Sequence, residues 1–341
     1  MLLVVNGFAA LPISFVEVGT IDITLIWVYY LVLAAATWLG SSWQRLSDLM
    51  PKAASFELPW KWVIPPLLVV AILVSVAAAT MPDDNLHVSF LDVGQGDAIL
   101  IQQGNQQVLV DGGPSPQAIS LGLSQKMPFW DRTIDLVILT HPSADHVTGL
   151  VEVLNRYQSK QVLHPDLEFE SDVYDQWLRL VRKKDIKCTI AQAGQQIVLG
   201  EVIIRVLNPP TPLLTGTESD IDNNGVVLHI SRGKVSFLLT ADIMWEAEFE
   251  LVARRANLTS TVLKVAHHGS DTSTCHEFLA VVNPRLAVIS VGADNPFGHP
   301  TPEVMERLEQ KLGSENIFRT DKHGTIEFIT DGERLWVKKQ K

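Results

Sequence analysis

The chain has 341 residues, a net charge of −11 and an apolar content of 47%, which is high for a soluble protein. This length allows one large domain or two smaller ones. The acidic balance excludes a surface that attracts polyanions in general, so any contact with nucleic acid would need a local basic patch or bound metal ions.

The first eighty residues carry the apolar excess. Two windows without charged side chains lie between Asp22 and Arg45 and between Lys61 and Asp83. Each window is close to the ~20 residues needed to cross a bilayer, and tryptophans flank both. We therefore predict a membrane segment over 1–81, with two transmembrane helices at about 22–43 and 62–81. A buried helical hairpin in a soluble protein is the alternative.

The basic residues predict an orientation for this segment. Arg45, Lys52 and Lys61 lie between the two windows, whereas acidic residues follow the second one. The positive-inside rule places the basic loop in the cytoplasm, so the rest of the chain is expected outside it, attached to the cell membrane. Because the chain begins in apolar sequence, we also expect it to be the end of a longer multi-pass protein.

From residue 86 the pattern is that of one β-rich domain, predicted over 86–341. Apolar runs at 86–93, 97–104 and 106–113, separated by glycines, predict an antiparallel meander. A buried strand at 134–139, helices at 147–157 and 171–184, and strands at 196–198, 202–207, 225–230 and 235–239 follow.

The second half repeats this order of elements. Helices are predicted at 246–256, 274–282 and 301–312, and strands at 261–266, 286–292, 317–320, 324–329 and 335–338. Two β-rich halves with flanking helices predict an α+β fold, in which two sheets pack face to face with helices outside.

Side chains that can hold a metal ion follow directly after the strand at 134–139. His141, Asp145 and His146 lie within six positions in the sequence HPSADH. Two imidazoles and a carboxylate in a loop at the end of a buried strand are typical of a site for Zn²⁺ or a similar divalent ion. The carboxyl ends of buried strands are also where α/β folds keep their chemistry.

Three more apolar strands end in acids or histidines. Asp111 ends VLVDGG, Asp242 ends FLLTADI, and the pair His267 and His268 follows TVLKVA. Such residues seldom end several apolar strands unless the strand ends converge on one site. We therefore expect these residues to meet the HPSADH loop.

In this order of motifs the chain resembles the metallo-β-lactamase fold hydrolases. Within them, FLDVGQGDAILI, HPSADH, LLTADI, VAHHGS and NPFGHPTPEV resemble the hydrolase domain of the ComEC family of competence DNA-internalisation proteins. The resemblance implies an αββα sandwich that follows a membrane domain, and a centre for one or two divalent ions, Mn²⁺ or Zn²⁺ and possibly Mg²⁺.

The resemblance also implies roles for individual residues. His141 matches a ligand of the first metal, Asp145 and His146 match ligands of the second, and Asp242 matches the acid that bridges both. Either His267 or His268 matches the late histidine ligand; His267 is favoured because it leaves the strand directly. Asp111 matches a buried acid that hydrogen-bonds behind the site.

Two positions depart from the pattern of this superfamily. Ser143 stands where the HxHxDH motif has its middle histidine, and Asn223 or Asn224 stands where a further histidine is expected. Oxygen ligands in place of imidazoles favour Mn²⁺ or Mg²⁺ over Zn²⁺, or leave the first site weakly filled. His299, between a strand and a helix, is expected either to contact a substrate phosphate near the metals or to be structural.

The resemblance favours a metal-dependent DNA phosphodiesterase, acting on the strand that is not taken up during transformation. Asp145, Asp242 and His299 are the expected catalytic residues, and the expected partners are single-stranded DNA, the membrane and the rest of a DNA-uptake channel with its competence machinery. The alternatives are another esterase of the same fold, such as a phosphocholine or small-ester hydrolase, and a degenerate domain that binds or gates DNA without cutting it.

Overall fold

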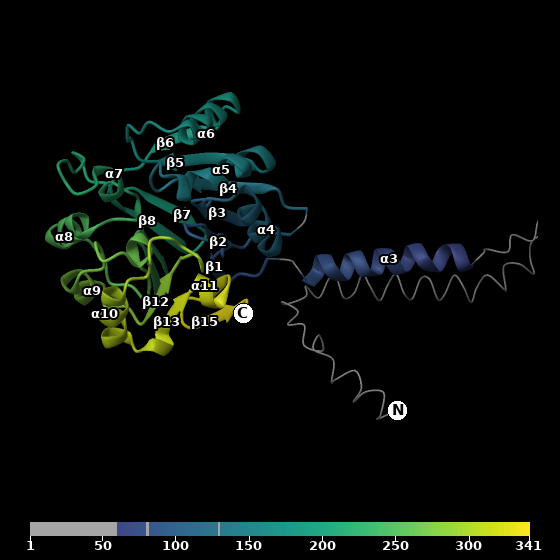
Figure 1. Ribbon diagram of the computed structural model, residues 1–341. Coiled ribbons are helices and arrows are strands. Elements are labelled where there is room, and N and C mark those ends of the chain that lie inside the picture. Colours follow the sequence, from purple (N-terminus) through teal and green to yellow (C-terminus); the bar gives the residue numbers. More distant parts are fainter. Residues whose placement is uncertain (1–59, 80–81, 129) are drawn as a thin grey trace, which may run out of the picture. The chain divides into compact units, whose positions relative to one another are not determined.

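The computed structural model describes residues 60–79, 82–128 and 130–341. The chain divides into two compact units, Met1–Asp83 and Asp84–Lys341. In the first unit the structure describes one helix, α3 (Trp60–Ala79). The second unit contains two β-sheets with helices on their outer faces (Figure 1).

The first sheet has eight strands in the order β15-β14-β1-β2-β3-β4-β5-β6. Its strands are β1 (Leu86–Phe90), β2 (Ile99–Gln103), β3 (Gln106–Val110), β4 (Thr133–Ile138), β5 (Gln158–His164), β6 (Lys187–Ile190), β14 (Ile326–Thr330) and β15 (Leu335–Lys339). The strands β1, β2 and β3 pair antiparallel, which confirms the predicted meander, whereas β3 to β6 run parallel.

The second sheet has seven strands in the order β13-β12-β11-β10-β9-β8-β7. They are β7 (Gln196–Leu199), β8 (Val202–Asn208), β9 (Val227–Arg232), β10 (Val235–Leu239), β11 (Val262–Lys264), β12 (Leu286–Ile289) and β13 (Ile317–Arg319). The strands β10 to β13 run parallel. Because parallel strands end at the same edge of a sheet, each sheet gathers several strand ends in one place.

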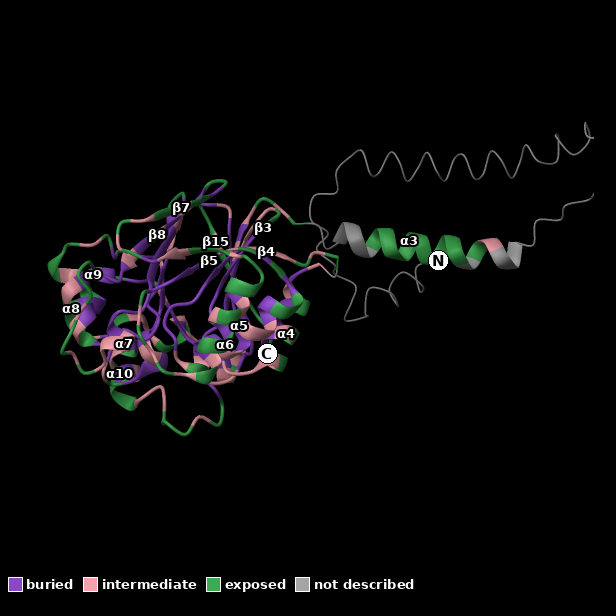
Figure 2. Ribbon diagram, turned by 90° about the horizontal axis from the view of Figure 1, so that it is seen from above, coloured by how far each residue is buried: buried purple, intermediate pink, exposed green. Residues whose placement is uncertain are grey.

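Three apolar layers hold the sheets and helices together. The inner layer lies between the sheets, where Phe237 of the second sheet packs edge-on against Phe328 of the first at 6.0 Å between ring centroids. Figure 2 shows these strands buried and the outer helix faces exposed. The four-layer arrangement confirms the predicted αββα sandwich.

The helices cover the outer faces of the sheets. On the first sheet these are α4 (Pro116–Lys126), α5 (Ala144–Arg156) and α6 (Asp172–Lys183), and on the second α8 (Trp245–Ala253), α9 (His276–Val282) and α10 (Pro302–Leu312). The sequence did not predict α4, whose glycine and serines weaken its apolar period, although Ser115 caps it by accepting from the Ala118 amide. The short helices α7 (Asp220–Asn223), η1 (Ala266–Gly269), η2 (Ser314–Asn316) and α11 (Thr320–His323) lie in connections.

The two predicted transmembrane helices are not confirmed. The first, at 22–43, lies outside the described residues, and the second overlaps α3. In the part of the chain that the structure describes, no helix combines the length and the apolar character needed to cross a membrane.

Candidate metal centre

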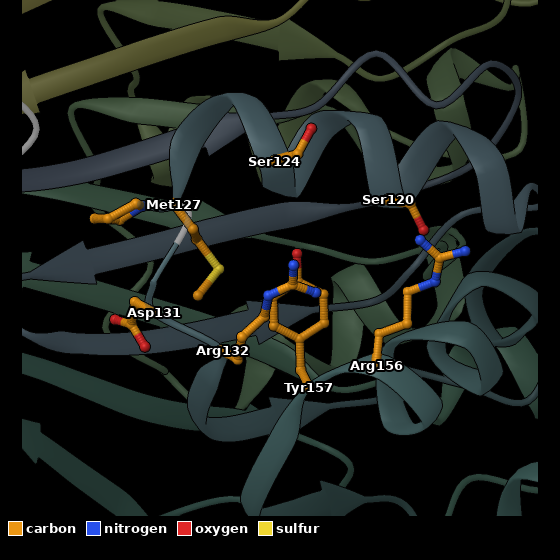
Figure 3. A pocket seen from close by; sticks show the side chains of 8 residues that line it. Ser120, Ser124, Met127, Asp131, Arg132, Arg156 and Tyr157 are labelled. Carbon is orange, nitrogen blue, oxygen red and sulfur yellow. The ribbon is translucent and has the colours of Figure 1, made fainter. Parts of the chain in front are cut away.

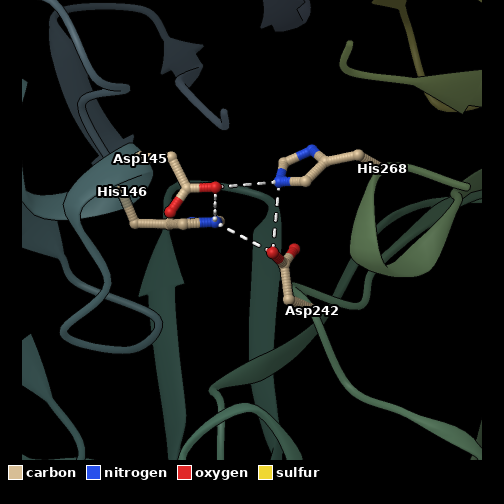
Figure 4. Close-up of side chains that lie close together, drawn as sticks. All are labelled: Asp145, His146, Asp242 and His268. Atoms are coloured by element: carbon tan, nitrogen blue, oxygen red, sulfur yellow. Dashed lines mark hydrogen bonds and ion pairs between the residues drawn. The ribbon is translucent and has the colours of Figure 1, made fainter. Parts of the chain in front are cut away.

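Four side chains from three connections converge between the sheet edges: Asp145, His146, Asp242 and His268 (Figure 4). One oxygen, Oδ2 of Asp242, lies 3.1 Å from Nε2 of His146 and 3.1 Å from Nε2 of His268. Oδ2 of Asp145 lies 3.4 Å from the same atom of His268 and 3.8 Å from that of His146. All four atoms lie within 4.8 Å of one another, so one small ion can reach them all.

The first turn of α5 carries Asp145 and His146, and its position depends on two glycines. The amide of Gly112 donates to the carbonyl of His146 at 2.8 Å, and the amide of Gly149 donates to the carbonyl of Gly113 at 2.8 Å. A Cβ atom at Gly149 would lie 1.8 Å from the carbonyl oxygen of Gly112. Only residues without side chains allow α5 to approach the connection after β3 so closely, and this contact fixes His146 beside Asp111.

The connection after β11 turns twice before it reaches the cluster. His267 and His268 both have left-handed backbone conformations, with φ of 50° and 54°. Nδ1 of His267 contacts the hydroxyl of Thr272 at 3.1 Å, and its ring lies against that of His299. The structure therefore brings His268, rather than the favoured His267, to the other candidate ligands.

Asp111 lies behind His146. Its Oδ2 accepts a hydrogen bond from Nδ1 of His146 at 2.8 Å and another from the hydroxyl of Thr140 at 2.6 Å, while Oδ1 accepts from the Thr140 amide at 2.8 Å. Because Nδ1 of His146 donates to this carboxylate, Nε2, which lies 3.1 Å from Oδ2 of Asp242, is the nitrogen that would bind an ion once it gives up its proton. Nδ1 of His268 likewise donates to the carbonyl of Ser290 at 2.8 Å, which leaves its Nε2 free to act as a ligand.

A buried lysine supports the cluster from the second sheet. Nζ of Lys264, at the end of β11, donates to the carbonyl of Ala241 at 2.8 Å and lies 3.3 Å from Oδ1 of Asp242. It also makes a short contact with Oδ2 of Asp97, and both side chains are almost fully buried. Lys264 thus holds one oxygen of Asp242 and leaves the other oxygen, Oδ2, for the cluster.

Opposite charges set the protonation of the cluster. Burial lowers the pKa of both imidazoles, but nearby carboxylates raise it by more. At His146 these are Asp242, Asp145 and Asp111, and at His268 they are Asp242 and Asp145. The pKa of His146 is therefore raised well above its usual value and that of His268 to about 10. Burial raises the pKa of Asp242, but the neighbouring His268, His146 and Lys264 lower it well below its usual value. Without an ion, both imidazoles therefore hold a proton on Nε2 against the carboxylates, and a divalent ion would take the place of these protons.

The donor set fits a divalent metal ion. Nε2 of His268 is buried and has no hydrogen-bond partner within the described part of the chain, although two carboxylate oxygens lie within 3.4 Å. Ligand atoms ~2.1 Å from one ion lie ~3.0–3.5 Å from each other, which is close to the distances found here. Two imidazole nitrogens and two carboxylate oxygens suit Zn²⁺ and Mn²⁺.

The remaining residues named from the sequence lie around this cluster. His141 contributes Nε2 at 4.0 Å from Oδ2 of Asp242. His299 lies next to His267 rather than in the cluster, and the centroids of the two rings are 5.9 Å apart. Ser143 is the N-cap residue of α5, and its hydroxyl makes no capping hydrogen bond.

Asn224 does not face the cluster. Its side-chain oxygen accepts a hydrogen bond from the amide of Leu214, and its side-chain nitrogen donates to the carbonyls of Leu214 and Asp220. The neighbouring Asn223 accepts hydrogen bonds from the amides of Met244 and Ala247. Both asparagines therefore hold the surrounding connections in place.

Sequence reasoning missed three charged residues at the site: Asp97, Lys264 and Asp222. Asp97 and Lys264 lie in FLDVGQGDAILI and TVLKVA, and a charge inside each apolar motif was the available signal. Asp222 lies in α7, with Oδ1 at 3.5 Å from Nε2 of His141. It directly precedes the two asparagines that the sequence had favoured.

A separate hollow lies at the other end of α5. It has a volume of about 160 Å³ and is lined by Ser120, Ser124, Met127, Pro128, Asp131, Arg132, Arg156 and Tyr157 (Figure 3). Two of its residues, Arg132 and Arg156, lie directly before β4 and at the end of α5. The candidate metal centre lies at the opposite ends of these elements, where His141 follows β4 and Asp145 is in the first turn of α5. The hollow is thus distinct from the candidate metal centre.

Residues 91–293 match the family model described as the metallo-beta-lactamase superfamily. The chain belongs to this superfamily. It is 29% identical to the ComE operon protein 3 of Bacillus subtilis over 71% of this chain and 33% of that protein. It is 32% identical to Recombination protein 2 of Haemophilus influenzae over 66% of this chain and 26% of that protein. It is 28% identical to the competence protein ComA of Neisseria gonorrhoeae over 82% of this chain and 36% of that protein.

These similarities confirm the resemblance to the ComEC family that the sequence motifs indicated. The chain spans about a third or less of the length of these relatives. The residues that match the family model, 91–293, lie in the second unit, which carries the candidate centre.

Proposed function

We propose that the metallo-β-lactamase domain is a metal-dependent phosphodiesterase that cleaves DNA, with single strands as its substrate. The observation that carries this proposal is the convergence of Asp145, His146, Asp242 and His268 on one point, with Nε2 of both imidazoles directed to it. A divalent ion at this point would supply Lewis acidity to a phosphoryl oxygen of the substrate.

The surrounding residues would keep the reacting groups in place. Asp111 orients His146 through its Nδ1, and Lys264 holds Oδ1 of Asp242, so both ligands are fixed before substrate arrives. Burial, followed by the neighbouring His267 and His268, lowers the pKa of His299, so its ring is neutral at pH 7. Its buried Nδ1 has no hydrogen-bond partner among the described residues, so we assign His299 to a substrate phosphate oxygen.

The names of the relatives favour DNA over other esters. One is a competence protein and another a recombination protein, and the proposed domain would act on DNA in that context. The proposal also places the domain outside the cytoplasm at the cell membrane, as the charge pattern of the first eighty residues predicts. An alkaline phosphatase fused to the carboxyl terminus tests this location, because the fused enzyme would be active only if that terminus lies outside the cytoplasm.

Cleavage of labelled single- and double-stranded DNA by the full chain tests the proposal, with Mn²⁺ or Zn²⁺ added and with a chelator as the reference. We expect metal-dependent cleavage, lost by at least 100-fold in His146→Ala because a ligand is removed. His276→Ala is the matched control, since His276 is exposed at the start of α9, outside the cluster. Activity that survives in His146→Ala contradicts the proposal.

The two alternatives give different results in the same assay. Cleavage of phosphocholine or small carboxylic esters without DNA cleavage would show another esterase of this fold. A chain that holds metal and binds DNA but cuts nothing would be a binding domain.

A further inference from the structure

His141 is buried at the cluster without the partners that the family pattern supplies. The superfamily pattern places two further histidines beside it, but this chain has Ser143 at one position and asparagines at the other. The asparagine side chains are bonded elsewhere, so they are not available to an ion at His141. The carboxylate of Asp222 instead lies beside His141, with Oδ1 at 3.5 Å from its Nε2.

Asp222 reaches His141 from α7, which begins after Ser219. The hydroxyl of Ser219 accepts a hydrogen bond from the Asp222 amide and so caps this short helix. Oδ1 of Asp222 then lies 3.5 Å from Nε2 of His141, and Oδ2 of Asp242 lies 4.0 Å from the same nitrogen. Three donor atoms from three connections therefore surround a second point next to the first cluster.

The hydrogen bonds around His141 leave no proton between its Nε2 and the carboxylate of Asp222 when the ring is neutral. The hydroxyl of Thr140 donates its one proton to Asp111. Its oxygen lies 3.1 Å from Nδ1 of His141 and therefore accepts a hydrogen bond from that nitrogen. Nε2 of a neutral His141 is then an acceptor that faces two carboxylate oxygens, which are also acceptors. Acceptors that face one another need a cation between them.

The distances distinguish this arrangement from a simple ion pair. In the pair of His146 and Asp111 the two atoms are 2.8 Å apart, as in a charge-assisted hydrogen bond. The 3.5 Å between His141 and Asp222 exceeds this, but it matches the ~3.0–3.5 Å between two ligands of one ion.

We propose that Asp222 replaces the missing histidines as a ligand at the first metal position, where it would hold a divalent ion together with His141 and Oδ2 of Asp242. The inference rests on the proposed metal centre, and it adds one ligand to it. Oδ2 of Asp242 is then shared between the ions of the two positions. One nitrogen and two oxygens make this position harder than that of His146 and His268, so it favours Mn²⁺ over Zn²⁺.

Metal content and Mn²⁺ titration of the full chain test this proposal without any assay of catalysis. We expect two Mn²⁺ ions per chain, with the electron paramagnetic resonance signal of a magnetically coupled pair because Asp242 bridges them. Asp222→Ala and Asp222→Asn should each bind one ion and lose the coupled signal. Asp222→His should recover the second ion, with a shift in preference from Mn²⁺ towards Zn²⁺.

Glu218→Gln is the matched control, since Glu218 is exposed in the same connection and its substitution removes the same charge. This variant should keep both ions. A wild-type chain that binds only one ion at saturation overturns the proposal, and so does an Asp222→Ala chain that keeps two. A chain that binds two ions, loses one in Asp222→Ala and cleaves no DNA leaves this inference standing and removes the proposed function.

Discussion

Replacement of Lys264 by methionine tests how the charge network holds the metal centre. Methionine keeps most of the length of the side chain and removes the ammonium group, which contacts Asp97 and lies 3.3 Å from Oδ1 of Asp242. Both Lys264 and Asp97 are 1% exposed, so water cannot replace the lost partner. The carboxylate of Asp97 would then lose the ammonium that it contacts, and Asp242 would keep only its imidazole neighbours.

Removal of one partner from a buried ion pair costs about 3–5 kcal/mol. A typical domain has about 5–15 kcal/mol of stability, so Lys264→Met should lose a large fraction of it. Asp97→Asn in the same chain removes one of the orphaned charges and should restore part of the loss, about 1–3 kcal/mol.

Guanidinium unfolding in the presence of a chelator, followed by circular dichroism, gives the free energy of unfolding for the wild type, both single variants and the double variant. The reasoning is refuted if Lys264→Met lowers the free energy of unfolding by less than about 1 kcal/mol, because removal of the ammonium should leave a buried carboxylate without its partner. It is also refuted if the double variant loses the sum of the two single losses, since that result shows no coupling.

Three further outcomes follow from other contacts. Asp111→Asn should weaken metal binding by about 10–100-fold in a competition titration, because it disturbs the carboxylate that orients His146; unchanged affinity would argue against that role. Gly149→Ala should cost about 3 kcal/mol or more in the free energy of unfolding, because the new Cβ atom would lie 1.8 Å from a backbone oxygen. Burial opposes ionisation of Glu327, but hydrogen bonds from His87 and Lys126 lower its pKa from 4.5 to about 2. Its contribution of about 2–3 kcal/mol is present above pH 4.5 and lost as pH falls towards 2, so the stability difference between wild type and Glu327→Gln should shrink over that range.

The sequence alone located the strand ends that carry the site. An apolar run followed directly by an acid or a histidine is a local pattern, and Asp111, His141 and Asp242 each follow a strand that the structure contains. The parallel pairing of β3 with β4 and of β10 with β11 then brings these ends together. Sequence order also sufficed for the αββα sandwich, because the alternation of strands and helices limits the layers that can pack.

The tertiary structure decided which side chain at each strand end faces the centre. His268 rather than His267 lies with the other candidate ligands, in a connection where both residues are left-handed. Asp222 rather than Asn224 faces His141, and the amide of Asn224 is bonded to backbone carbonyls nearby. Lys264 and Asp97, from different sheets, meet only when the sandwich forms. Local sequence fixes where a strand stops, but the direction of a side chain beyond that point depends on backbone turns and on partners remote in sequence.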